Sequence, residues 1–292
     1  MNDRHKYAFL CLLAIALLLS SASFRPAWAQ SAPSLGAASS FSVLGGQAVT
    51  CTGSVITGEL GVSPTPAFTN TGCTIAGGTP PATDVAAALA RTAFLNAYAA
   101  IGLMPCSQTI GTAAFTGNVP ALGPLAPGVY CFPAAVTFTN TTLTLDGSTN
   151  PNGIWIFKVG AALTGSGFQV VMANGAQPCN VFWSVGAATT LSTSTLPPLF
   201  QGNILAGNAA GGSVTITGGS LIGRVLANVA VTMTATNIHG SCALISQAKA
   251  TCDADDSDHH HDKDKDKDKD KDRDHDKDHD KDGDKNNGHG DE

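Results

Sequence analysis

The residues from Ser213 to Asn237 read SVTITGGSLIGRVLANVAVTMTATN. Two runs in this stretch, Val214–Thr217 and Val231–Thr234, alternate an apolar residue with threonine. Successive side chains of a β-strand point to opposite faces, so each run predicts a strand with an apolar inner face and a threonine outer face. Between them, GRVLAN at 223–228 is similar to GNILAG at 202–207, 21 residues earlier. Recurrence at such a period predicts the stacked coils of a solenoid.

Similar strands recur through the middle of the chain. The runs GVYCF at 128–132, GIWIFKVG at 153–160 and NVFWSVG at 180–186 are each followed by a small, threonine-rich strand. Alternation predicts an outward ladder of hydroxyl-bearing side chains, with Ala162 in a place where threonine is expected. The ladder comprises Thr137, Thr139, Thr164, Thr190, Ser192, Thr215, Thr217, Thr232 and Thr234, with Thr50 and Thr52 from an opening coil. The expected inward stack is Phe138, Leu163, Leu191, Ile216 and Met233, and Trp155 and Trp183 are also expected in the core.

One segment has helical periodicity. Apolar residues recur every three or four positions across 84–101, which predicts a helix that begins near Asp84 with Thr83 as its N-cap. This helix is expected to cover a flank of the solenoid with its apolar stripe. The stripe comprises Val85, Ala88, Leu89, Thr92, Phe94, Leu95, Tyr98 and Ile101.

The first 29 residues have the pattern of an export signal. Arg4, His5 and Lys6 precede an apolar run at 7–19, and AWA at 27–29 fits a small-x-small cleavage site. The run is shorter than the roughly 20 apolar residues that a membrane span needs. The sequence therefore predicts cleavage after Ala29, a secreted, periplasmic or cell-surface location, and no membrane span in the mature chain.

Charge is divided unevenly along the mature chain. Residues 30–252 hold three acidic and four basic side chains, a net charge of +1, whereas 253–292 hold 18 acidic and nine basic ones, a net charge of −9. The body at 30–252 is long enough for one large core and is expected to form one domain. The tail at 253–292 alternates Asp with Lys, Arg or His, and is expected to be a disordered, solvated polyampholyte.

The tail also carries a partial cation-binding pattern. Its residues Asp278, Asp280, Asp282 and Asp284 are similar to the start of a calcium loop, but His289 stands at the twelfth position, where a bidentate Glu is needed. We therefore expect no cofactor and no metal site in the body. Weak divalent-cation binding by the Asp and His side chains of the tail stays open.

Seven cysteines remain after the export signal, without a Cys-x-x-Cys pair, which argues against zinc or thioredoxin chemistry. An exported chain can keep disulfides. Proximity along the sequence favours Cys51–Cys73, Cys106–Cys131 and Cys179–Cys242, with Cys252 left over.

The body offers few groups for catalysis. Its acid–base residues are three carboxylates and His239. A Ser/His/Asp set with Asp84 or Asp146 lacks a Gly-x-Ser-x-Gly elbow to support it. Arg224 and Lys158 make no basic patch, which argues against a nucleic-acid partner. We therefore predict no catalytic residues and no enzymatic activity.

Several motifs, in order, resemble the microbial ice-binding-like (antifreeze) protein family. They are FSVLGG at 41–46, VITGELGVSP at 55–64, PGVYCF at 127–132, NPNGIWIF at 150–157, NGAQPCNVFW at 174–183 and GNIL at 202–205. The resemblance spans about residues 35–242. It implies a mainly β fold, a discontinuous right-handed β-solenoid of triangular cross-section with one long helix packed alongside, and it implies adsorption to ice.

A threonine ladder suits an ice surface as its partner. Stacked strands lie about 4.8 Å apart and residues i and i+2 about 6.7 Å apart, so the ladder is a regular grid of methyls and hydroxyls. Threonine is stiff at χ1 and loses little freedom on adsorption. We expect a monomer that restrains ice growth or recrystallisation. Threonine is also a common strand residue, so a surface or matrix adhesin that binds glycan or protein, with a cation-binding tail, is the alternative.

Overall fold

The computed structural model describes residues 31–240, except for position 66 and the segments 77–84, 118–121 and 194–198. Three predicted regions therefore lie outside the described residues: the export signal, the helix N-cap at Thr83 and Asp84, and the tail with Cys242 and Cys252.

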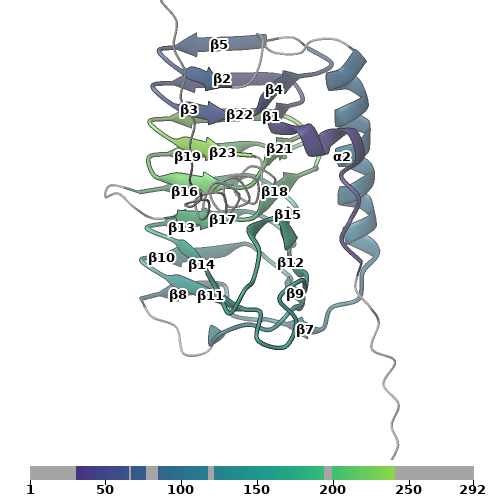
Figure 1. Ribbon diagram of the computed structural model, residues 1–292, viewed down its shortest axis with the longest axis vertical. Coiled ribbons are helices and arrows are strands. Elements are labelled where there is room, and N and C mark those ends of the chain that lie inside the picture. The colour runs from purple at the N-terminus through teal and green to yellow at the C-terminus, as the bar shows by residue number, and fades with distance from the viewer. Residues whose placement is uncertain (1–30, 66, 77–84, 118–121, 194–198, 241–292) are drawn as a thin grey trace, which may run out of the picture. The chain divides into compact units, whose positions relative to one another are not determined.

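The described chain winds into coils whose strands stack into three parallel walls (Figure 1). Sheet A has the order β4 (Glu59–Val62), β1 (Phe41–Gly45), β21 (Val225–Ala227), β18 (Asn203–Ala206), β15 (Val181–Val185), β12 (Trp155–Val159), β9 (Gly128–Phe132) and β7 (Gln108–Thr109). Sheet B has the order β5 (Ala67–Thr71), β2 (Ala48–Thr52), β22 (Ala230–Thr234), β19 (Val214–Thr217), β16 (Thr189–Ser192), β13 (Leu163–Ser166), β10 (Val136–Thr139) and β8 (Ala114–Thr116). The third wall runs through β6 (Thr74–Ala76), β3 (Val55–Thr57), β23 (Asn237–His239), β20 (Ser220–Ile222) and β17 (Leu199–Gln201) to β14 (Gln169–Ala173) and β11 (Thr142–Asp146).

The solenoid is discontinuous in sequence. The first coil stacks on the last coil, because β1 pairs with β21 and β2 pairs with β22. The second coil stacks on the other side of the first, because β4 pairs with β1 and β5 pairs with β2. The helix α2 (Val85–Leu103) then runs back along sheet A to the far end of the stack, where β7 and β8 begin the next coil (Figure 1). Two 3-10 turns, η1 (Gly36–Ser40) and η3 (Pro178–Asn180), complete the described elements. The predicted fold class, a right-handed β-solenoid with one helix alongside, is confirmed.

The predicted helix is confirmed, but its predicted stripe is wrong in part. Val85 and Leu89 are 73% and 58% exposed. The residues buried on sheet A and η1 are Ala87, Ala90, Phe94, Ala97 and Ile101. Three of these five are alanines, which let the helix lie close to the sheet, whereas the prediction favoured the larger apolar residues. By length and composition alone α2 could cross a membrane, and one of its faces contacts β1, β12, β15 and β18.

The three Lys and Arg side chains of the described residues form hydrogen bonds that join the helical segments to sheet A and its flanking residues. Lys158 donates to the carbonyl oxygens of Gly102 and Met104 at 2.9 and 2.8 Å, at the C-terminal end of α2 where a cation is favourable. Arg91 of α2 donates from Nη2 to Asn228 Oδ1 at 2.6 Å. Arg224 donates from Nε to the carbonyl oxygen of Ser39 in η1 at 2.8 Å, and burial lowers the pKa of its guanidinium.

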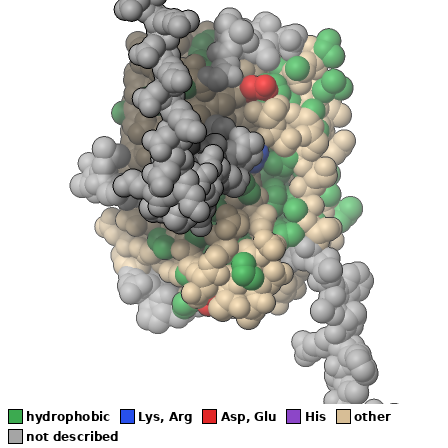
Figure 2. Space-filling view, in the orientation of Figure 1, with side chains coloured by type: hydrophobic (Ala, Val, Ile, Leu, Met, Phe, Trp, Pro, Cys, Tyr) green, Lys and Arg blue, Asp and Glu red, His purple; other side chains and the backbone are tan. Residues whose placement is uncertain are grey.

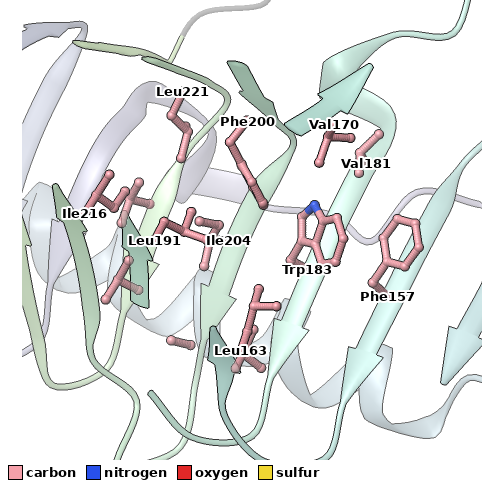
Figure 3. Close-up of a cluster of buried hydrophobic side chains, with 14 of the residues drawn as sticks. Phe157, Leu163, Val170, Val181, Trp183, Leu191, Phe200, Ile204, Ile216 and Leu221 are labelled. Carbon is pink, nitrogen blue, oxygen red and sulfur yellow. The ribbon is translucent and has the colours of Figure 1, made fainter. Parts of the chain in front are cut away.

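Hydrophobic side chains, both aliphatic and aromatic, fill the space between the walls (Figure 3). Trp155 and Trp183 are fully buried, as predicted. The rings of Phe157 and Trp183 stack with centroids 4.1 Å apart, and Phe200 of the third wall lies 5.3 Å from Trp183. Trp155 donates from Nε1 to the carbonyl oxygen of Leu125 at 2.8 Å. The indoles are therefore core residues with satisfied donors.

Two of the predicted disulfides are confirmed. Cys51–Cys73 joins β2 to the turn before β6, and Cys106–Cys131 joins the segment after α2 to β9. Each lies near one end of the stack, where a coil has a neighbour on one side only. Cys179 is also disulfide-bonded, and its predicted partner Cys242 lies outside the described residues.

Replacing Thr189 by valine is expected to stabilise the protein. Its side chain is 1% exposed between Leu163 and Val214, and its Oγ1 has no hydrogen-bond partner. Thr189→Val keeps the shape and removes the unsatisfied hydroxyl, so we expect a gain of about 1 kcal/mol in the free energy of unfolding. Denaturant unfolding measures it. The matched control is Thr141→Val, because the equally buried Thr141 hydroxyl donates to the carbonyl oxygens of Phe115 or Thr139 and its loss must destabilise. A loss from both variants would contradict the prediction.

Candidate functional site

Sheet B presents two straight outward columns of small hydroxyl side chains. The first column, in stacking order, is Thr69, Thr50, Thr232, Thr215, Thr190, Thr164, Thr137 and Ala114. The second column is Thr71, Thr52, Thr234, Thr217, Ser192, Ser166, Thr139 and Thr116. Every member is exposed or half-buried. The register is continuous through all eight strands, whereas sheet A has a shift between β1 and β4.

All eleven predicted ladder residues lie in these two columns, so the structure brings them together on one surface. Sequence reasoning missed Thr69, Thr71, Thr116 and Ser166. The run AFTNT at 67–71 has the same alternation as AVTCT at 48–52, and this signal could have revealed the outermost strand.

The predicted pairing register between β10 and β13 was wrong by two residues. Ala162 precedes the strand and lies outside the two columns, which β13 fills with Thr164 and Ser166. Leu163 pairs with Val136, so it belongs to a different inward row from Phe138. Gly165 stands opposite Phe138, and the ring of Phe168, from the corner after β13, stacks on Phe138 with centroids 4.1 Å apart. The missing side chain at Gly165 is thus replaced by one from the next corner.

The surface rests on a packed layer. Phe138 lies inward between Thr137 and Thr139, is fully buried, and stacks on Phe115 as well as Phe168. Further along the same inward row are Leu191, Ile216, Met233 and Cys51. A support of this kind fixes the Cα positions of the threonines above it.

The corner after the second column is turned at most coils by a residue with positive φ. These residues are Gly53, Gly72, Gly117, Asn140, Gly167, Gly218 and Ala235. Buried hydroxyls secure the same corner, since Thr141 and Thr236 lie 3.1 Å from the carbonyl oxygens of Thr139 and Thr234. The corner therefore ends each outward pair at the same point on every coil.

Ala235 is a member of this series with a strained backbone conformation. Its φ is +50°, a conformation that costs an L-residue with a Cβ about 1–2 kcal/mol. Because Ala235 is exposed and buries nothing, we expect Ala235→Gly to raise the free energy of unfolding by about 1 kcal/mol. Thermal and denaturant unfolding check this. Gly218→Ala at the equivalent corner is a control with the opposite expected sign. It should lower the free energy of unfolding, because its new Cβ would meet the carbonyl oxygen of Thr193 at 2.6 Å. An unchanged or lower stability of Ala235→Gly would contradict the prediction.

The third wall lacks this regularity. Its outward positions mix unlike side chains, among them Gln169, Val171, Ser220, Ile222, Asn237, His239, Val55 and Thr74. Figure 2 shows charged side chains only as isolated spots on the face in view. Among the described residues, sheet B strands carry no charged side chain, and no group of three His, Cys, Asp or Glu lies close enough to hold a metal ion.

The predicted acid–base residues are not brought together. Asp146 is on β11 and His239 on β23, with β14, β17 and β20 between them. At about 4.8 Å per strand this separates them by roughly 19 Å. Asp146 instead accepts hydrogen bonds from Asn174 Nδ2 and the backbone N–H of Ser148, which lower the pKa of its carboxyl. A Ser/His/Asp set with Asp146 is therefore excluded, and Asp84 lies outside the described residues.

Comparison with known proteins agrees with this architecture. The profile of the ice-binding-like family matches residues 43–239. The chain is 38% identical over 263 residues to an ice-binding protein of Nostoc sp. strain HG1, which covers 88% of this chain and 91% of that protein. The crystal structure of an ice-binding protein from Antarctomyces psychrotrophicus superposes with a TM-score of 0.60 at 26% identity, covering 73% of this chain and all of that one. A domain of Shewanella frigidimarina ice-binding protein 1 gives 0.59 at 28%, covering 72% and 98%.

The β-solenoid of this chain is thus the fold of solved proteins that carry the ice-binding name. This chain belongs to the ice-binding-like family.

Proposed function

We propose that this protein adsorbs to ice through sheet B and restrains ice growth or recrystallisation. The observation that supports it most is the pair of unbroken columns, fifteen hydroxyl residues and one alanine on eight consecutive strands. A crystal offers a periodic array of water sites, so a rigid periodic array of methyls and hydroxyls can meet many of them at once. The matches to ice-binding proteins support the same function.

The absence of charge on the strands of sheet B favours this partner. A charged side chain holds its own hydration shell and would have to lose it, at a cost of several kcal/mol, to meet a crystal surface. A threonine hydroxyl can take the place of a water in a hydrogen-bonded lattice. The adhesin alternative has no support from the comparisons, which match ice-binding proteins throughout.

The test is thermal hysteresis and ice-recrystallisation inhibition on the full mature chain from Gln30. We expect a gap between the melting and freezing points, faceted crystals within that gap, and enrichment of labelled protein in a growing ice hemisphere. The same chain ending at Cys252 measures what the tail adds. A folded mature chain that shows none of the three effects would overturn the proposal.

We further infer an exported, monomeric protein without catalytic activity or cofactor. The disulfides of the body suit an oxidising compartment, in line with the export pattern at 1–29. The outermost strand of sheet B supports the monomer. Asn70 stands at an inward position of β5, and its Oδ1 accepts a hydrogen bond from the N–H of Cys73 at 2.8 Å. A polar residue at that position discourages a second solenoid from stacking there.

A further inference from the structure

A third outward column runs beside the first column of sheet B. It lies two residues before each first-column residue, on the same side of the strand. Its members on the described coils, here called the alanine column, are Ala67, Ala48, Ala230, Ser213, Ala188, Ala162, Ala135 and Thr112. Six of the eight are alanine, the other two are the small residues Ser213 and Thr112, and all are exposed or half-buried.

The alignment of this column follows from the pairing. Ala48 pairs directly with Ala67 on one side and with Ala230 on the other. Further along the stack, backbone hydrogen bonds join Thr189 to Ser213 at 2.8 Å and Leu163 to Ala188 at 3.0 Å. The alanine column therefore continues in the same register as the threonines.

Core packing does not account for the choice of alanine. These side chains are exposed or half-buried. Ala67, Ala48 and Ala230 lie within strands, where branched and aromatic residues are favoured over alanine, and the other members come just before a strand. The corresponding outward places on the third wall hold side chains as different as Thr74, Val55, Asn237, Ser220 and Gln169. A restriction to small side chains on sheet B alone calls for a reason on its outer surface.

We propose that the alanine column is the third column of the ice-contact surface, and that its small size is required by the rigidity of the partner. This inference rests on the proposed function and extends it to new residues. A flexible ligand can bend around a protruding side chain, but a crystal plane cannot. Any side chain that rises above the threonine methyls therefore holds the whole plane away. Alanine also has no rotamer freedom to lose on adsorption.

The experiment places tyrosine in the alanine column without removing a threonine. Ala230→Tyr stands in the middle of the face, and Ala67→Tyr stands on the end strand β5. Val55→Tyr is the matched control, because Val55 is an outward strand residue, 40% exposed, on β3 of the third wall. Ala230→Ser tests whether small size, rather than alanine itself, is what matters. Thermal hysteresis and melting temperature are measured on the full mature chain.

We expect Ala230→Tyr and Ala67→Tyr to lose at least half of the thermal hysteresis at an unchanged melting temperature, and Ala230→Ser and Val55→Tyr to keep it. Wild-type hysteresis in both folded tyrosine variants would overturn the inference and leave the ice contact confined to the two hydroxyl columns. If Ala230→Tyr unfolds, the result for Ala67→Tyr decides, because β5 has a neighbour on one side only. A wild type without hysteresis would overturn the proposed function instead, so the two failures are distinguishable.

Discussion

The double variant Thr215→Tyr/Thr232→Tyr is expected to lose most of its thermal hysteresis while it stays folded. The two threonines are direct partners on β19 and β22, in the middle of the first column. Two adjacent tyrosine rings would stand above the plane of sheet B and separate a crystal surface from the threonines on both sides. Thermal hysteresis and ice-recrystallisation inhibition measure the loss.

Stability should change little in this variant. Both positions are half-buried on the outer surface, tyrosine is a favourable strand residue, and such surface substitutions usually change the free energy of unfolding by no more than about 0.5 kcal/mol. A circular dichroism melt checks this directly.

A paired control has the same chemistry on another wall. Val55 and Asn237 are direct partners on β3 and β23, both exposed, one wall away from the columns. Val55→Tyr/Asn237→Tyr should therefore keep wild-type hysteresis. Wild-type hysteresis in both double variants would show that ice does not contact sheet B. The same loss of hysteresis in both would show that a tyrosine pair lowers activity on either wall.

The sequence predicts which residues of a single strand face outward on sheet B, but it does not predict how many strands the face includes. A Thr-x-Thr run specifies its own inner and outer sides, so Thr215, Thr217, Thr232 and Thr234 could be placed from the pattern alone. The position of the first coils could not be predicted in this way, because β1 pairs with β21 through residues 182 positions apart, as in Val43 with Val225. The alternation in AFTNT at 67–71 indicates a strand, but it does not say that this strand pairs with β2 and extends the ladder.

Two other errors share one cause, which is the weight given to large side chains. The prediction aligned Leu163 with Phe138, whereas Gly165 stands opposite Phe138 and Phe168 from the next corner fills the space over that glycine. It also gave α2 a stripe of bulky residues, whereas alanines make its contact with sheet A. Small residues occur in this protein where two segments lie close together. Phe168 packs over Gly165, and the alanines of α2 pack on sheet A.

Phe138→Ala is expected to affect stability and ice activity together. The side chain is fully buried and stacked between Phe115 and Phe168. Truncating a buried phenylalanine costs about 3–5 kcal/mol, and here the cost should lie at the upper end because Gly165 on the next strand cannot fill the cavity. Denaturant unfolding measures the loss.

The cavity would lie directly beneath the two columns. Thr137 and Thr139 flank Phe138 on β10, so the surface above is free to sink or twist once its support is removed. We therefore expect thermal hysteresis to fall even near 0 °C under conditions where the variant is fully folded.

Phe94→Ala separates this local effect from general destabilisation. Phe94 is also fully buried, but it packs α2 on sheet A, away from the columns. Its loss should cost a similar 3–5 kcal/mol and leave the hysteresis of the folded fraction unchanged. Reduced hysteresis in both variants would mean that activity follows global stability. A reduction in Phe138→Ala alone would mean that ice is met by a surface whose flatness depends on the aromatic layer beneath it.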